Sequence, residues 1–237
     1  MSEIIEDINN VDDPNGEITI KREKKKEQGG SAFVAVMFLP LVYLYLETMI
    51  MIMINGFNAK TFLYLVVFSL GYGLIASGIS MAPKWKGGKW FLLFIFMLIA
   101  VVFLNIELFC HIMYSNYMGL TVVFQSAEEV VGSYTQTIFD LLKNNWIKLV
   151  AMLVPMIAFL IFGRKLSSVT VKGSRCVLCF IIGILCIGLG VGIAMMSTSG
   201  IVSDREYLTD KFDYTQSAYH FGLINTTYTD AVYMVWG

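Results

Sequence analysis

Histidine and cysteine are scarce in this chain of 237 residues, which holds two histidines and four cysteines. Cys176 and Cys179 have the C-x-x-C spacing, but no second pair follows to complete a zinc site. All four cysteines lie in or beside apolar runs, which favours apolar packing over a disulfide framework or a redox role. The sequence shows no set of nucleophile, base and orienting group, so we do not expect this chain alone to be catalytic.

Charged residues are also few. They make up 15% of the chain, whereas hydrophobic residues make up 57%, above the roughly 45–50% that is usual for soluble domains. The 17 basic and 18 acidic residues nearly cancel, so no nucleic-acid partner is expected. A cleavable signal peptide is not expected either, because the mostly polar residues 1–30 precede the first apolar run.

Long apolar runs account for the hydrophobic excess. A bilayer core of about 30 Å is crossed by about twenty apolar residues in a helix that rises 1.5 Å per residue. The predicted spans cover residues 33–54, 61–81, 91–113, 146–162 and 176–196. The predicted fold class is therefore all-α, a polytopic bundle of five transmembrane helices that occupies residues 31–196.

Three segments flank or interrupt this bundle. Residues 1–30 are acidic and then basic, and we predict a disordered cytoplasmic tail. Residues 114–145 carry apolar side chains at helical spacing among polar ones, which predicts an amphipathic helix that either lies on the outer surface or caps the bundle. Its apolar residues are Val130, Val131, Tyr134, Ile138, Leu141 and Leu142. Residues 197–237 form a polar and aromatic tail, predicted to be an external linker.

The basic residues predict the orientation of the chain. Residues 1–30, 82–89 and 163–175 hold twelve of the seventeen Lys and Arg residues. Cytoplasmic loops are enriched in Lys and Arg, and only an odd number of spans puts these three segments on one side. We therefore predict a cytoplasmic N-terminus and an external C-terminus.

Four polar side chains inside the apolar runs form the candidate site: Glu47 in the first span, and Asn105, Glu107 and His111 in the third. A charged group at membrane depth costs on the order of 2.5–3.5 kcal/mol, so it needs a partner or a function. Our hypothesis is a polar pocket, open to the outside, that contacts a lipid head group or the base of an external domain. The alternative is that these groups bond one another and only hold the helices together. No metal is assigned, because only two ligand types converge.

Small residues one turn apart predict close contacts between helices. Gly73 and Ser77 have this spacing in the second span, and Gly188 and Gly192 have it in the fifth. Residues without bulky side chains let helix backbones approach closely in lipid. We expect both pairs to lie at helix interfaces.

Two stretches resemble the N-terminal membrane part of the lipoteichoic acid synthase family. Residues 105–125 resemble the family's third span and the segment that leaves it, with an Asn, aromatic residues and a Thr-to-Gln run. Residues 212–233 resemble the linker before the family's catalytic domain, through Tyr-His-Phe-Gly-Leu at 219–223 and Tyr-Thr-Asp at 228–230. The likeness covers residues 33–237.

The resemblance implies a sulfatase-like phosphoglycerol transferase of the alkaline-phosphatase superfamily, with five spans and a large external catalytic domain. In that family the threonine nucleophile and the ligands of a divalent metal, usually manganese, lie in the external domain. This chain ends at Gly237, before any of them, so no catalytic residue and no cofactor is assigned to it. It is expected to be either a piece of a longer protein or a chain that lacks the enzyme half.

The resemblance therefore predicts a domain that anchors and positions a transferase acting on phosphatidylglycerol at the outer face of a bacterial cytoplasmic membrane. Expected partners are membrane lipids, phosphatidylglycerol among them, and cell-envelope enzymes. Two other functions stay open. One is a small transporter or channel subunit, and the other is a non-catalytic scaffold of the cell envelope.

Overall fold

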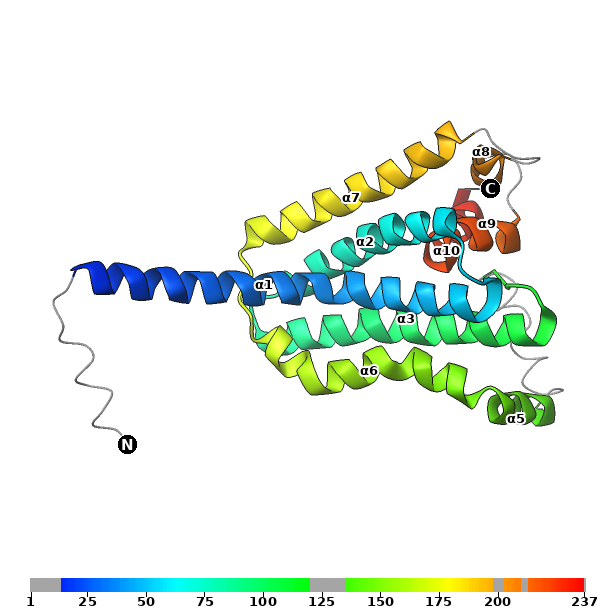
Figure 1. Cartoon of the computed structure of the whole chain (residues 1–237), viewed down its shortest axis with the longest axis horizontal. Coiled ribbons are helices and arrows are strands. Elements are labelled where there is room, and N and C mark those ends of the chain that lie inside the picture. Colours follow the sequence, from blue (N-terminus) through cyan, green and yellow to red (C-terminus); the bar gives the residue numbers. More distant parts are fainter. Residues whose placement is uncertain (1–13, 120–134, 198–202, 210–212, 237) are drawn as a thin grey trace.

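The computed structural model describes residues 14–119, 135–197, 203–209 and 213–236. Every regular element in these residues is a helix (Figure 1). In chain order they are α1 (Pro14–Ile50), the π-helix η2 (Met51–Asn55), α2 (Ala59–Met81), α3 (Lys86–Tyr114), α5 (Thr135–Asn144), α6 (Trp146–Ser167), α7 (Gly173–Met196), α8 (Asp204–Thr209), α9 (Tyr214–Phe221) and α10 (Leu223–Trp236).

Five helices within the described residues are long and apolar enough to cross a membrane. They are Ala32–Ile54 (the end of α1 with η2), Ala59–Met81 (α2), Lys86–Tyr114 (α3), Trp146–Ser167 (α6) and Gly173–Met196 (α7). The all-α bundle of five spans is thus confirmed. The predicted and observed span boundaries differ most at the start of α3 and at the end of α6. There the helix extends beyond the predicted span and includes Lys86 and Arg164. Lys and Arg can occupy the ends of a membrane-spanning helix because their long side chains let the charged group reach water.

The N-terminal segment differs from the prediction. We expected residues 1–30 to be disordered, but α1 begins at Pro14 and runs without a break into the first span. Residues 17–28 are mostly Glu, Lys, Arg and Gln, which are good helix formers, and Pro suits the first position of a helix. Residues 1–13 lie outside the described part of the chain, as do Val130, Val131 and Tyr134 of the predicted amphipathic helix. Its last part is α5.

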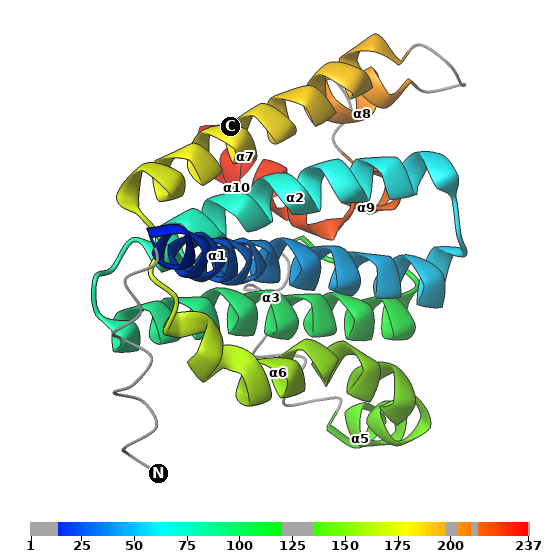
Figure 2. The same cartoon turned by 60° about the vertical axis from the view of Figure 1, so that its left-hand side comes forward.

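The spans pack as a row, with α7 on α2, α2 on α1, α1 beside α3, and α6 on α3 (Figures 1 and 2). The core lies mainly between α1, α3 and α6, and α2 adds Ala76 and Met81 to it. Leu39 and Leu46 of α1 and Leu93, Met97 and Leu104 of α3 are fully buried there. Helices α6 and α7, in contrast, leave many large apolar side chains exposed on their outer faces, as expected for helices that contact lipid.

One of the two predicted small-residue pairs lies at a helix contact. A Cβ atom on Gly73 would overlap the backbone of Pro40, so α2 approaches α1 closely at this point, and Ser77 is fully buried one turn further on. The pair Gly188 and Gly192 is a correction. A Cβ atom on either would meet nothing within 4 Å in the described structure.

Helix α7 instead packs on α2 through Gly183 and Gly190. A Cβ atom on Gly183 would lie 2.7 Å from the carbonyl oxygen of Gly71, and one on Gly190 would lie 2.8 Å from the Phe68 ring. Residues seven apart share a helix face, whereas Gly188 lies more than 100° around the helix from Gly183. The spacing within the glycine run was therefore sufficient to suggest contact but not to choose the face.

Different segments of the chain lie at the two ends of the bundle (Figure 1). The N-terminal part of α1, the α2–α3 connection and the α6–α7 connection lie at one end, which we call the basic end. Helices α5, α8, α9 and α10 lie at the other, which we call the C-terminal end. At the basic end, buried Lys89 donates to the carbonyl oxygen of Val169 over 2.8 Å and ties α3 to the α6–α7 connection.

Candidate functional site

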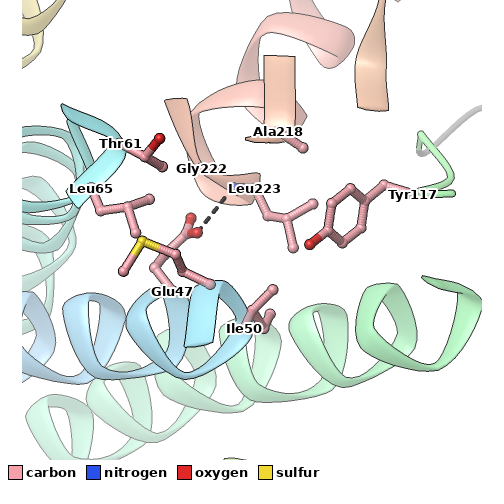
Figure 3. A pocket seen from close by; sticks show the side chains of 9 residues that line it. Glu47, Ile50, Thr61, Leu65, Tyr117, Ala218, Gly222 and Leu223 are labelled. Carbon is pink, nitrogen blue, oxygen red and sulfur yellow. Dashed lines mark hydrogen bonds between the residues drawn. The ribbon is translucent and has the colours of Figure 1, made fainter. Parts of the chain in front are cut away.

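Glu47 lies near the end of the first span, and its side chain is 3% exposed. The N–H of Leu223 donates to Oε2 over 3.0 Å, and the N–H of Ile224 donates to Oε1 over 2.6 Å (Figure 3). These N–H groups belong to the first turn of α10, where a helix has no internal acceptors for them. A carboxylate there also meets the positive end of the helix dipole. Glu47 therefore caps α10 and holds it against the spans.

Gly222 makes this contact possible. It joins α9 to α10 with a φ of +86°, in a region that residues with a Cβ atom rarely adopt. A Cβ atom on it would overlap Leu65 and lie 2.9 Å from Oε2 of Glu47. The absence of a side chain thus lets the turn between the two helices come down onto the carboxylate.

Glu107, buried in α3, holds a second point of the C-terminal segment. Its Oε2 accepts the N–H of Met118 over 3.1 Å, and its Oε1 accepts the hydroxyl of Tyr214 over 3.1 Å. The Tyr214 oxygen also lies 3.1 Å from Oγ1 of Thr227. Burial first, and then the nearby Glu107 carboxylate, raise the pKa of Tyr214, so its hydroxyl stays protonated and can donate. Glu107 therefore links α3, α9 and α10.

His111 lies one turn after Glu107 and packs among aromatic rings. Its ring centroid is 4.7 Å from that of Tyr117 and 6.1 Å from that of Tyr219. The Nδ1 atom is buried and has no hydrogen-bond partner among the described residues. His111 thus contributes a ring to the contact between the end of α3 and α9.

Asn105 faces a different part of the molecule. Its Nδ2 donates over 2.7 Å to the carbonyl oxygen of Val101 in its own helix. The side chain lines an apolar groove of about 430 Å³ between α3, α5 and α6. Asn105 therefore does not join the glutamates.

The predicted single pocket is thus corrected to two separate anchoring points. Within the described residues no hydrogen bond joins any two of Glu47, Asn105, Glu107 and His111. The space next to Glu47 is about 10 Å³, about that needed for one water molecule. The alternative that these groups bond one another is not observed either. The hydrogen-bond partners of Glu47 and Glu107 are residues 118, 214, 223 and 224, and no local pattern in the sequence predicts these pairings.

A third anchoring point, around Asp204 of α8, was missed by the sequence analysis. Its Oδ2 is 2.7 Å from Nζ of Lys60 and accepts the hydroxyl of Tyr64 over 2.9 Å, and its Oδ1 is 3.6 Å from Nδ1 of His220. Burial acts to raise the pKa of Asp204, but hydrogen bonds from Lys60, Tyr64 and Ser197 outweigh it and bring the pKa below its ordinary value. No local spacing signals this group, because Asp204 and Tyr64 are 140 positions apart.

In these three places buried acidic side chains attach the C-terminal helices to the spans. Among the described residues no three His, Cys, Asp or Glu side chains lie close enough to hold a metal ion.

The fold and these attachment points define a polytopic helical membrane domain whose C-terminal helices fold back onto its own spans. The family model described as the lipoteichoic acid synthase N-terminal domain matches residues 18–235. Because the match covers nearly the whole chain, the chain belongs to this family and is a multi-pass membrane protein. The resemblance seen in residues 105–125 and 212–233 is thereby confirmed. Comparisons with curated proteins and with solved structures found no match.

Proposed function

We propose that this chain anchors and positions a lipoteichoic acid synthase-like phosphoglycerol transferase that acts on phosphatidylglycerol at the outer face of a bacterial cytoplasmic membrane. In this proposal the basic end is cytoplasmic and the C-terminal end is external, as the positive-inside rule predicts. The partners are membrane lipids, phosphatidylglycerol among them, and enzymes of the cell envelope. A divalent metal such as manganese would belong to a catalytic domain.

The attachment of α10 through Glu47 is the observation that carries this proposal. A simple anchor needs only one span, and a flexible linker would let a following domain sample many distances from the membrane. Here α9 and α10 are held by Glu47 and Glu107, which lie in two different spans. The place and direction of the C-terminal helices are therefore set by the bundle. A domain attached beyond them would be held in a preferred position above the lipid.

An ion or proton pathway receives less support from the same geometry. Both carboxylates lie toward the C-terminal end, and their oxygens accept hydrogen bonds from the C-terminal segment and from Met118. A relay requires polar groups that continue across the membrane. Among the described residues Ala35, Leu39 and Leu93 are buried in α1 and α3 toward the basic end, and the buried Lys89 there donates to a backbone carbonyl rather than to another titratable group.

Positioning can be separated from anchoring by two fusions. A catalytic domain of the same family would follow either residue 237 of this chain or a single unrelated transmembrane helix, in proteoliposomes of phosphatidylglycerol. Release of diacylglycerol reports transfer of glycerol phosphate. We expect faster turnover for the fusion to this chain, and a fall toward the single-helix rate with Glu47→Ala. Equal rates for the two fusions would refute positioning, and Asp140→Asn, a charge loss on exposed α5, is the control.

Orientation needs a separate measurement. In a chain whose four cysteines are replaced by Ala, Ser115→Cys at the C-terminal end should react with a membrane-impermeant maleimide added to intact cells. Lys84→Cys at the basic end should react only after the cells are opened. Both positions are exposed, so access to the side chain is not limiting. The reverse pattern would show that the C-terminal end is cytoplasmic.

A further inference from the structure

A second pocket lies at the C-terminal end, beside the Glu47 site. It has a volume of about 320 Å³ and lies where the connection between η2 and α2 meets the end of α9. Its lining residues are Met51, Gly56, Asn58, Thr61, Tyr219 and His220. We call it the Asn58 pocket. Met51 and Thr61 also line the small cavity next to Glu47, so the two sites are neighbours.

The start of α2 contributes hydrogen-bond donors to this pocket. Asn58 is the N-cap of α2, and its Oδ1 accepts the N–H of Lys60 over 3.0 Å. Because the oxygen is used in this way, the amide nitrogen of Asn58 remains as a donor. The N–H of Thr61, in the first turn of α2, has no acceptor within its own helix. The positive end of the α2 dipole points at the same place.

The Thr61 hydroxyl is a further donor at the pocket wall. The residue is 8% exposed, and its hydroxyl makes no hydrogen bond within the described part of the chain. In Figure 3 this hydroxyl points away from the Glu47 carboxylate, so Glu47 does not accept from it. The hydroxyl oxygen is not among the buried atoms that lack a partner, so it is accessible and can donate to an acceptor that enters the pocket.

The oxygens of the two nearby carboxylates already have partners. Asp204, which faces His220 at 3.6 Å, is bound by Lys60 at 2.7 Å and by Tyr64 at 2.9 Å. Both carboxylate oxygens of Glu47 accept hydrogen bonds from α10. The pocket therefore offers donors without a free carboxylate, an arrangement that suits an anion with several oxygen atoms.

The depth of the pocket identifies the source of such an anion. The second span begins at Ala59, next to Asn58, and so places the pocket where the bilayer core meets the head groups. Phe57 and Leu63, which flank Asn58 and Thr61 in the chain, are exposed and can contact acyl chains. We propose that the Asn58 pocket binds the phosphodiester head group of a phospholipid. The proposed function adds only which leaflet this lipid belongs to. If the C-terminal end is external, the pocket faces the outer leaflet, which would supply the transferase with its substrate.

Binding can be measured on the full chain purified in a neutral detergent. Dioctanoylphosphatidylglycerol, dioctanoylglycerol and glycerol 3-phosphate would be titrated separately by native mass spectrometry. We expect saturable binding of the phospholipid, and no comparable binding of the other two. Thr61→Val removes only the hydroxyl and should weaken binding about tenfold, as for a hydrogen bond to a charged group. Thr61→Ser should restore it.

Asn58→Asp is the sharper variant. Aspartate is as good an N-cap as asparagine, so α2 should be kept, but the donor is replaced by a carboxylate that repels an anion. Binding should be lost. Asn116→Asp makes the same charge change at an exposed position outside the pocket and should leave binding unchanged. Retained amide protection of Ile224 in each variant shows that the Glu47 site is intact.

Three results would overturn the proposal. Equal binding of dioctanoylglycerol would show that the phosphate is not recognised, and equal binding of glycerol 3-phosphate would show a site for a free phosphate rather than a lipid. Unchanged binding in Asn58→Asp would place the lipid elsewhere. None of these results depends on the fusion experiment with Glu47→Ala, so failure of the pocket and failure of positioning are distinguishable.

Discussion

The carboxylate of Glu47 accepts the backbone N–H of Leu223 over 3.0 Å, although the two residues are 176 positions apart in the chain. The first span thus holds the N-terminus of the last described helix. The same carboxylate accepts the N–H of Ile224, and Gly222 provides the turn that brings both donors to it. The buried Glu47 carboxylate needs hydrogen-bond donors, and the first N–H groups of α10 need acceptors. Each therefore satisfies the other.

Loss of the Glu47 carboxylate should release α10. Glu47→Ala leaves two buried N–H groups without acceptors, and each such group costs about 1–3 kcal/mol. We expect faster amide hydrogen exchange at Leu223 and Ile224, while α2 and α3 keep their protection. Asp140→Asn, which removes an exposed charge on α5, should change neither. Unchanged exchange at Ile224 in Glu47→Ala would contradict the capping role.

The hydroxyl of Tyr214 should contribute more to the stability of the fold than an ordinary tyrosine hydroxyl does. Tyr214→Phe removes the donor to Glu107 and the contact with Thr227, and hydrogen bonds to charged groups contribute about 1.5–3 kcal/mol. We expect faster proteolysis within α9 and a lower Tm. Tyr228→Phe is the matched control, because Tyr228 is 57% exposed. Equal effects of the two substitutions would argue against the Glu107 anchor.

Two glycines of α7 should respond differently to the same substitution. In Gly183→Ala the added methyl group would lie 2.7 Å from the carbonyl oxygen of Gly71, so α7 must move away from α2. Overpacking of this kind typically costs about 1–3 kcal/mol. Gly188→Ala adds a methyl group where nothing lies within 4 Å, and should be neutral or slightly stabilising. Thermal unfolding in detergent compares them, and a larger effect of Gly188→Ala would place the α2 contact on the other face of α7.

Acidification should loosen the contact around Asp204 in two stages. Burial lowers the pKa of His220 below 6.5, although Asp204 opposes this, so the folded state disfavours protonation and stability falls as pH drops below about 6.5. The pKa of Asp204 in the folded state also lies below its ordinary value of 3.8. The ionised Asp204 therefore stabilises the folded state above pH 3.8. This stabilisation is lost as the pH falls through the lower pKa of the folded state. Hydrogen exchange of α8 and α9 as a function of pH measures both stages.

Each stage has its own control variant. His220→Gln should remove the stage that begins below pH 6.5, and Asp204→Asn should remove the stage below pH 4 while weakening the contact at every pH. A profile that stays flat between pH 7 and pH 5 in the unmodified protein would contradict the assignment to His220. The two variants also separate this contact from the Glu47 and Glu107 anchors, which do not include either residue.

Local composition was enough to predict the spans. Apolar runs predicted a first span at 33–54 and a second at 61–81, and the structure has them at Ala32–Ile54 and Ala59–Met81. Helices in a bilayer satisfy their own backbone groups, so a run of about twenty apolar residues determines the element without reference to the rest of the chain. The contact at Gly73 was also predictable, since a small residue in a span has few other uses.

The polar residues show where such reasoning ends. The cost of an acid in lipid indicated that Glu47 and Glu107 need partners, and that inference depends on the residue and its depth alone. Which atoms serve as partners is a different matter, because Leu223 and Ile224 contribute backbone N–H groups that every non-proline residue carries. Likewise only packing chose Gly183 over Gly188. The sequence by itself determined the five apolar helices and the residues that could not remain unpaired among them; the tertiary structure decided their partners, because those are brought close only when the chain folds back on itself.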